Sequence, residues 1–555
     1  MSERLTHVTA VRPRSKDGMG LLASIAISVA LICALPMLAV ALAAFGGGTD
    51  TVAHLASTVL PRYAGTTLVL VVLVALGTFS IGVGAAWLVT MTRFPGVRFF
   101  EIALVLPLAF PAYVLAYAYT SVLDHAGIVQ STLRQITGWA PRDYWFPEIR
   151  SLGGAAVMLV LVLYPYVYLL ARAAFLQQSA TTFLAARALG SNAWAAFVKV
   201  SLPMARPAIA GGVLLAVMET IADFGTVAYF GVQTFATGIY TSWFSLADRT
   251  GAAQLALCLL SFALLLAMLE RAQRGRAKYH DPSRRQQRLE PAQLRGGPAA
   301  AAVVLCGIPV LFGAVMPVGL LLIMGLESEQ NLLSPRYLGF LRNSLTLAAT
   351  AALLTVGAAI CVGFYRRLRP GRLSQTAAYF ARLGYAVPGG VIAVGLLVPF
   401  AAFDNALDAW MRARFDISTG LLITGSIWLL VMAYMVRFLA AALGAYEGGQ
   451  AMVPANMDAA ARSLGQTPSG TLRRVHLPVL APSLLTALLI VFVDVMKELP
   501  ATLIMRPFNY DTLAVQAYRL ASDERLAGAA VPSLVIVAVG LLPVILICAQ
   551  VGRRR

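Results

Sequence analysis

The chain has 555 residues, of which 59% are hydrophobic and only 12% are charged. Soluble domains contain about 25% charged residues, so the composition excludes a soluble globular protein. Basic residues outnumber acidic ones by 43 to 25, which gives a formal net charge of +18. In a membrane protein such an excess collects in cytoplasmic loops, so the positions of the charges decide what it means.

Apolar runs of about 20 residues are long enough to cross a bilayer as helices, and the chain contains twelve of them. The sequence therefore predicts an all-α polytopic membrane protein. The first run is longer than the apolar core of a signal peptide, which has about 7–15 residues, so we expect it to be a retained span. The predicted spans are 20–45, 66–91, 100–123, 151–176, 206–232, 250–270, 298–325, 343–365, 380–401, 419–446, 480–505 and 529–550.

The basic residues lie mainly in the loops that share a side with the amino terminus. By the positive-inside rule, both termini and the loop after the sixth span are cytoplasmic. That loop is interpreted as a solvated connector that fixes the topology, and the spread of charge over many short loops excludes a nucleic-acid patch. The predicted parts are a cytoplasmic tail (1–19), a first transmembrane domain (20–270), a basic linker (271–297), a second transmembrane domain (298–550) and a basic carboxyl terminus (551–555).

The residue types that usually carry catalysis or bind metals are scattered along the chain. The five cysteines and five histidines form no C-x-x-C pair and no H-E-x-x-H motif. Nucleophile-elbow and phosphate-binding loop motifs are also missing from the sequence. We therefore expect a chain that is not an enzyme, with no metal site and no cofactor of its own.

Two segments, 184–207 and 459–482, match without a gap at an offset of 275 residues. Each copy lies between the fourth and fifth predicted spans of its half, on the cytoplasmic side. The chain is thus predicted to consist of two homologous six-span bundles in parallel orientation. Two such halves normally enclose a path along the axis between them, although a structural scaffold could also arise by duplication.

Each copy contains a short stretch of small residues that ends at a glycine, Gly190 or Gly465. Glycine is suited to a left-handed cap at the end of a helix. A second segment follows in each copy, and we expect it to stop at Leu-Pro because proline cannot continue a preceding helix. Such a compact, alanine-rich elbow could occupy a groove of another protein, and the alternative is a plain connecting loop.

At these residues the chain resembles the permease subunits of bacterial ABC importers, whose cytoplasmic EAA loop docks onto an ATPase subunit. The glutamate of that loop is missing from both copies, because Leu184 and Ala459 occupy its position and Asp458 precedes the second. The resemblance implies a type I importer fold in the bacterial inner membrane, two cytoplasmic ATPase subunits that bind ATP, and a periplasmic binding protein. The coupling residues that it implies are Ala185, Ala186, Gly190, Leu202, Pro203, Asp458, Ala460, Ala461, Gly465, Leu477 and Pro478.

Two further stretches, 218–240 and 493–518, are similar to fused two-repeat ferric-iron permeases that work with a periplasmic iron-binding protein. Permeases for thiamine and aminoalkylphosphonates share much of this architecture and are alternatives for the cargo. A twelve-span secondary transporter is an alternative of a different class. It would fit the hydropathy equally well but would not require paired EAA-type loops.

Charged residues also lie inside two matched spans. A charge at mid-bilayer costs at least about 2.5–3.5 kcal/mol, so such residues face a partner or a wet cavity. Within each span two acids are four residues apart, which predicts that they share one helix face. Carboxylate oxygens suit a hard cationic cargo, so these side chains could line the translocation path. The residues are Glu219, Asp223, Asp494, Lys497 and Glu498.

The alternative for this group is a structural brace in which Lys497 pairs with Asp494 or Glu498. Gly225 and Pro500 follow the acids at matched positions and are expected to break or kink both helices. The loop 124–150 is predicted to form an amphipathic periplasmic cap. Its aromatic side chains are expected at the membrane surface, with contact to a binding protein as the alternative. These side chains are Trp139, Tyr144, Trp145 and Phe146.

Overall fold

A computed structural model describes residues 17–46, 57–141, 143–178, 186, 188–274, 291–331 and 333–553. Within these ranges, eleven helices are long and apolar enough to cross a membrane, and one bent pair of helices can make a twelfth. The predicted all-α class and the number of spans are therefore confirmed. Most of the amino-terminal tail and of the basic linker lies outside the described residues.

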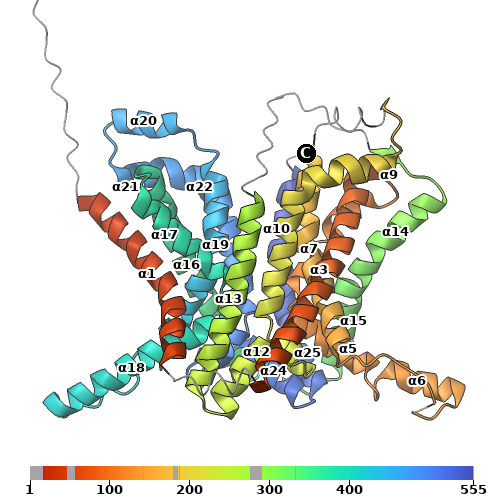
Figure 1. The fold of residues 1–555 in the computed structure, drawn as a ribbon, viewed down its shortest axis with the longest axis horizontal. Coiled ribbons are helices and arrows are strands. Elements are labelled where there is room, and N and C mark those ends of the chain that lie inside the picture. Colours follow the sequence, from red (N-terminus) through yellow and green to blue (C-terminus); the bar gives the residue numbers. More distant parts are fainter. Residues whose placement is uncertain are drawn as a thin grey trace, which may run out of the picture.

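The first half consists of long helices joined by short helical turns (Figure 1). Its elements are α1 (Asp17–Phe45), α3 (Leu60–Met91), β1 (Thr92–Arg93), α4 (Val97–Ala103), η1 (Leu106–Ala109), α5 (Ala112–Leu123), α6 (Ile128–Thr137), α7 (Leu152–Leu176), α9 (Ala193–Ala196), η2 (Phe197–Ser201), α10 (Leu202–Ala222), α11 (Gly225–Tyr229), α12 (Phe235–Tyr240), η3 (Thr241–Ser245) and α13 (Arg249–Arg274).

The second half repeats this plan after a two-residue strand, β2 (Ala292–Gln293), which pairs in parallel with β1. Its helices are α14 (Gly297–Val310), η4 (Leu311–Val315), α15 (Met316–Leu326), α16 (Pro335–Leu368), α17 (Arg372–Leu383), η5 (Gly384–Ala386), α18 (Gly389–Phe415), α19 (Ile427–Gln450), α20 (Ala455–Ser463), α21 (Pro468–Thr471), η6 (Leu472–His476), α22 (Leu477–Met496), α23 (Pro500–Met505), α24 (Leu513–Ser522) and α25 (Leu526–Arg553).

The third predicted span, 100–123, is not a straight helix. The segment Val97–Ala109 meets Ala112–Thr137 at an angle of 92°. Pro111 stands at the break with an extended backbone and caps α5, and Pro107 is the second residue of the preceding short helix η1. Proline and the residue before it disfavour a continuous helix, which explains why this apolar run bends.

The fifth and eleventh predicted spans are also interrupted, as expected from Gly225 and Pro500. Helix α10 ends at Ala222 and the chain resumes as α11, while α22 ends at Met496 and resumes as α23. The expectation that the two acids of each pair share one helix face is wrong. The second acid of each pair, Asp223 or Glu498, lies in the break after the helix has ended.

The expectation that Leu-Pro stops a helix in each repeated segment is likewise wrong. Helix runs without a break from Trp194 to Ala222 and from Pro468 to Met496. A π-helical turn precedes the proline in each copy, at η2 and η6. The wider turn shifts the hydrogen bonding by one residue and so accommodates a proline, which has no N–H to donate.

The two halves are tied together by an exchange of their first helices. Helix α1 packs against α16, α17 and α18 of the second half, and α14 and α15 contact α3, α4 and α5 of the first. In the centre of each half, α7 packs on α3 and α10 as α19 packs on α16 and α22. Small residues allow this close packing, since a Cβ added to Gly212 would lie 2.8 Å from the Cα of Val167.

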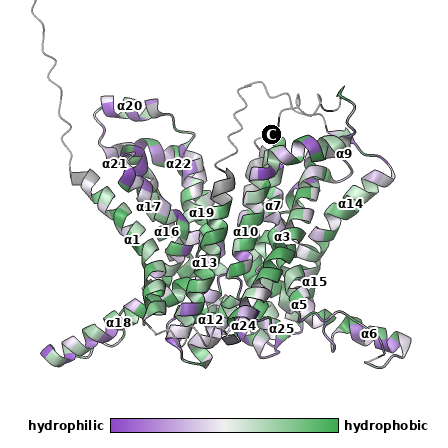
Figure 2. Cartoon of the chain, viewed as in Figure 1, coloured by the Kyte–Doolittle hydropathy of each residue, from purple (hydrophilic) through white to green (hydrophobic). Residues whose placement is uncertain are grey.

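The described parts of the repeated segments, the start of α1 and the end of α25 lie at one face of the bundle. Helices α9, α20 and α21, the start of α1 and the carboxyl end are found there, while α6, α12 and α24 lie at the opposite face (Figure 1). Hydrophobic residues dominate the long helices between the faces, and hydrophilic residues are conspicuous on α20 and α21 (Figure 2). The long helices thus form an apolar belt of the kind that crosses a bilayer.

Candidate functional site

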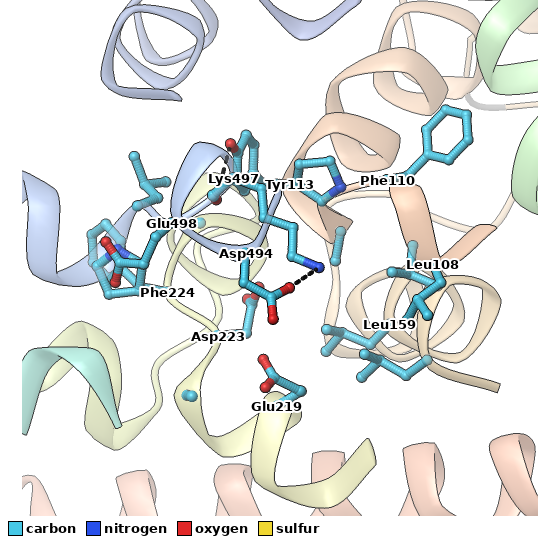
Figure 3. A pocket seen from close by; sticks show the side chains of 18 of the residues that line it. Leu108, Phe110, Tyr113, Leu159, Glu219, Asp223, Phe224, Asp494, Lys497 and Glu498 are labelled. Atoms are coloured by element: carbon cyan, nitrogen blue, oxygen red, sulfur yellow. Dashed lines mark hydrogen bonds and ion pairs between the residues drawn. The ribbon is translucent and has the colours of Figure 1, made fainter. Parts of the chain in front are cut away.

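A cavity of about 100 Å³ lies between the two halves, beside the breaks that follow α10 and α22. Its walls come from α5, α7, α10 and α11 of the first half and from α19, α22 and α23 of the second. All five charged residues predicted for the path are gathered here (Figure 3). One arginine also lines the cavity. Four carboxylates face two cations, which leaves a formal charge of −2. The charged residues are Glu219, Asp223, Arg437, Asp494, Lys497 and Glu498.

Two of the carboxylates are fixed as caps of the short helices that follow the breaks. Asp223 accepts the N–H groups of Thr226 and Val227 at 3.1 Å each, and the Thr226 hydroxyl at 3.0 Å. Glu498 accepts the N–H groups of Ala501 at 2.9 Å and Thr502 at 3.0 Å. These bonds satisfy the free donors at the start of α11 and α23, so both acids have a structural role.

The other two carboxylates are held by side-chain cations. Asp494 pairs with Lys497, three residues further along, at 2.9 Å between Oδ1 and Nζ. Glu219 lies 3.7 Å from Nη2 of Arg437 on α19 and accepts a hydrogen bond of 3.1 Å from the Tyr385 hydroxyl. The first pair is local, whereas the second connects the two halves of the chain.

The repeated segments at the other end of the bundle share a turn at their glycines. Gly190 has φ of +87° and Gly465 has φ of +72°, the left-handed conformation predicted for both. The turns are closed by N–H groups that reach back five residues, from Ser191 to Ala186 and from Gln466 to Ala461, at 3.1 and 3.0 Å. Ala185 lies outside the described residues.

The sequence matches the family described as binding-protein-dependent transport system inner membrane component, over residues 78–279 and again over 351–555. The chain belongs to this family. It is therefore an ABC importer permease of two fused repeats, and the predicted duplication is confirmed because each half matches the family by itself.

Three relatives illustrate the range of this permease family. The Fe(3+)-transport system permease protein FbpB 2 of Haemophilus influenzae is 26% identical over 87% of this chain and 88% of its own length. The ferric transport system permease protein FbpB of Actinobacillus pleuropneumoniae is 24% identical over 75% of this chain and 60% of its own length. A putative 2-aminoethylphosphonate permease protein, PhnV of Salmonella typhimurium, is 28% identical over 44% of this chain and 92% of its own length.

In the permease, the Asp458 carboxylate is held by two side chains of its own half, Arg367 and His476, and we call this group the Asp458 clamp. Its carboxylate lies 2.7 Å from Nε of Arg367 and 2.7 Å from Nε2 of His476, which is fully buried beside Phe364. Partial burial by itself would raise the pKa of Asp458, but the hydrogen bonds from His476 and Arg367 outweigh it and lower this pKa. The first copy has Phe183 and Ser201 at the matched positions, so this clamp belongs to the second copy alone.

The predicted coupling residues differ in their exposure. Ala460 is exposed, Ala461 is buried, and the prolines lie in the helices that begin at Leu202 and Leu477. The most exposed apolar side chains of the two turns were missed by the prediction. They are Leu189, 87% exposed, and Leu464, 79% exposed. Their identity at the repeat offset, directly before each glycine, was the available signal.

Arg437 was also missed, although it interrupts the apolar run of the tenth predicted span. A charged residue inside a span is expected to face a partner, and this signal could have identified it. Gly389, at the start of α18, leaves room for the side chains of Glu498 and Arg437. A Cβ at this glycine would lie 2.8 Å from Oε1 of Glu498 and 3.3 Å from Nη1 of Arg437.

Proposed function

We propose that this permease is the translocation subunit of an importer whose cargo is ferric iron. The observation that carries the proposal is the cavity between the two halves, in which four carboxylates outnumber two cations. Carboxylate oxygens are suitable ligands for a hard, highly charged cation, and an excess of negative charge disfavours anionic cargo such as molybdate or a phosphonate. Relatives named for Fe(3+) and ferric transport support the same choice.

The four carboxylates have different roles in this proposal. Asp223 and Glu498 are engaged by backbone N–H groups and hold the breaks in shape. Glu219 and Asp494 are bound by side-chain cations, and these can be exchanged for a cation that passes through. Arg437 and Lys497 thus neutralise these two carboxylates whenever no cargo is bound. The cargo moves along the path by transient competition with them.

The second part of the proposal concerns the partners. Two ATPase subunits dock at the face that carries α9 and α20, one on each repeated segment, and this face is cytoplasmic. A periplasmic binding protein delivers cargo at the opposite face. ATP is bound and hydrolysed by the partner subunits, whose closure pushes the two segments together and rocks the halves about the cavity.

Docking can be tested at the two exposed leucines. Leu189→Asp and Leu464→Asp should each reduce copurification of the ATPase, because they place a charge on the apolar contact of a coupling turn. The matched control is Leu333→Asp, since Leu333 is equally exposed at 79% but precedes α16 in a loop on the opposite face. Unchanged ATPase recovery in both coupling variants would exclude these turns as the docking sites.

The cargo can be tested with the permease reconstituted in vesicles together with its ATPase and binding protein. ATP-dependent uptake of ferric iron is expected, with little uptake of thiamine, 2-aminoethylphosphonate or molybdate. The double variant Glu219→Gln/Asp494→Asn should lower iron uptake at least tenfold while the ATPase still copurifies. Uptake driven by an ion gradient without ATP would favour a secondary transporter, and full iron uptake by the double variant would exclude these acids from the path.

A further inference from the structure

Two arms extend sideways from the bundle at the face opposite the repeated segments (Figure 1). The α6 arm comprises α6 and the returning chain 138–150, and the α18 arm comprises the last part of α18, from residue 402, with the returning chain 416–426. They occupy equivalent places in the two halves, because α5 and α18 both begin directly after a capping proline, Pro111 or Pro388. The sequence predicted an amphipathic cap at the first arm only.

In the α18 arm the polar side of the helix is covered by its own returning chain. Asp404, which is fully buried, accepts the N–H groups of Ile423 at 3.1 Å and Thr424 at 2.8 Å. One turn further on, Asp408 accepts the N–H groups of Thr419 at 2.7 Å and Gly420 at 2.9 Å. The loop therefore fixes this side of the helix and leaves the other side free.

The α6 arm is built in the same way with different side chains. Gln130 donates to the carbonyl oxygen of Leu123 at 2.9 Å and accepts the Tyr144 hydroxyl at 2.9 Å. Arg134, one turn further along, donates to the Tyr144 oxygen at 2.9 Å. Tyr144 belongs to the returning chain, so here too the loop is attached to the polar side of the helix.

The sides that the loops leave uncovered are apolar. In the α18 arm, Phe403 is 54% exposed and Trp410 is 56% exposed, and their spacing of seven residues places them on one helix face. In the α6 arm, Ile128 is 66% exposed and Ile136, two turns further on, is 80% exposed. Trp145 of the returning chain is 86% exposed. Large apolar side chains at helical spacing indicate a surface that meets a nonaqueous partner.

The lipid bilayer is the partner that fits these surfaces. Helix α18 has 27 residues and a length of about 40 Å, so it reaches beyond the bundle in which it begins. It begins inside the bundle at Gly389 and continues without a break into the arm, so the arm's apolar face continues the lipid-facing belt. Tryptophan and phenylalanine are typical of the apolar face of helices that lie in the membrane interface. Amphipathic helices lie there with their apolar face about 5–10 Å deep.

We propose that the two arms are interfacial anchors that lie on the membrane surface opposite the repeated segments, with Phe403, Trp410, Ile128 and Ile136 in lipid. Both arms are close to electroneutral, with two acidic and three basic residues in 128–150 and three acidic and two basic residues in 402–426. Attachment therefore depends on apolar burial and needs no anionic lipid. Because the arms extend from opposite sides of the bundle, they limit its tilt in the membrane.

The test uses the full chain in vesicles of phosphatidylcholine whose acyl chains carry bromine near the headgroup. Bromine quenches indole fluorescence on contact, whereas iodide in the buffer quenches indoles that face water. Difference spectra between the wild type and Trp410→Phe, and between the wild type and Trp145→Phe, isolate one indole from each arm. The substitutions are conservative and lie at exposed positions, so folding is not expected to change.

Each difference spectrum gives the emission of the substituted tryptophan in the wild type. Brominated lipid is expected to quench this emission at least twofold. Iodide should quench it little, and salt should not change it. Quenching of this tryptophan emission by iodide but not by brominated lipid would overturn the proposal, because the arms would then be exposed to water. A tryptophan that becomes shielded only when the binding protein is added would also overturn it. That result would instead assign the arms to protein docking.

Discussion

Replacing Arg437 by methionine should destabilise the permease, because Glu219 would lose its cationic partner inside the cavity. The two charged groups are 3.7 Å apart, with side-chain exposures of 11% for the arginine and 29% for the glutamate. At an effective dielectric constant of about 20, unit charges at this distance attract by about 4 kcal/mol. Desolvation offsets part of this attraction and Tyr385 still donates to the carboxylate, so we expect a loss of about 2 kcal/mol.

A double-mutant cycle with Glu219→Gln isolates the contribution of the pair. Removing both partners should cost less than Arg437→Met alone, since no unpaired carboxylate remains, and the coupling energy should be about 1–3 kcal/mol. The measurement is the free energy of unfolding in detergent by denaturant titration. Arg412→Met is the control, because Arg412 is 60% exposed in its pair with Asp408 and exposed pairs contribute little to stability.

The reasoning is refuted if Arg437→Met is no more destabilising than Arg412→Met, or if the cycle gives no coupling energy. Glu219 would then be satisfied by water and by Tyr385, and the contact between the halves would not depend on this ion pair. Retained stability with a loss of iron uptake would place Arg437 in the path without a bracing role.

Four further changes test other parts of the structure. Valine at Gly190 or Gly465 should abolish uptake without preventing membrane insertion, because a φ near +80° strains a β-branched residue. The measurements are iron uptake and recovery of the copurified ATPase. Lys497→Met should lower the melting temperature by removing the partner of Asp494. Gly389→Ala should also lower it, because the new Cβ would lie 2.8 Å from Glu498. Asp458→Asn should flatten the acid side of the stability curve, which melting temperatures between pH 3 and 7 would show.

The sign of the pH effect follows from the lowered pKa of Asp458. A carboxylate with a lowered folded pKa stabilises the fold fully above its unfolded pKa, near 4, and loses this contribution as the pH falls through the folded value. Equal acid sensitivity of the wild type and Asp458→Asn would contradict this role of the Asp458 carboxylate.

For the variants of Gly190 and Gly465, valine at Gly444 is the control, since a Cβ there meets open space and the φ of Gly444 is not positive. Normal uptake by both glycine variants would exclude the strained turns from coupling.

The sequence by itself determined the features that depend on local chemistry or on the repeat. Long apolar runs located the spans, because only a helix satisfies its own backbone in lipid. The left-handed turns at Gly190 and Gly465 and the breaks before Gly225 and Pro500 followed from the properties of glycine and proline. The sequence placed the intramembrane acids in two matched spans as candidates for lining the path, and the structure gathers them in one cavity.

Only the tertiary structure decided which groups satisfy one another. Glu219 is paired by Arg437, which is 218 residues away in the chain and comes from the other half, so no spacing rule could predict the contact. Asp223 and Glu498 became caps because α10 and α22 end one and two residues before them, inside the apolar runs 206–232 and 480–505. The exchange of α1 and α14 between the halves also arises from packing. The second arm depends on hydrogen bonds between α18 and its returning chain. Hydropathy reports how apolar a segment is, whereas its neighbours depend on the shapes that fit together in three dimensions.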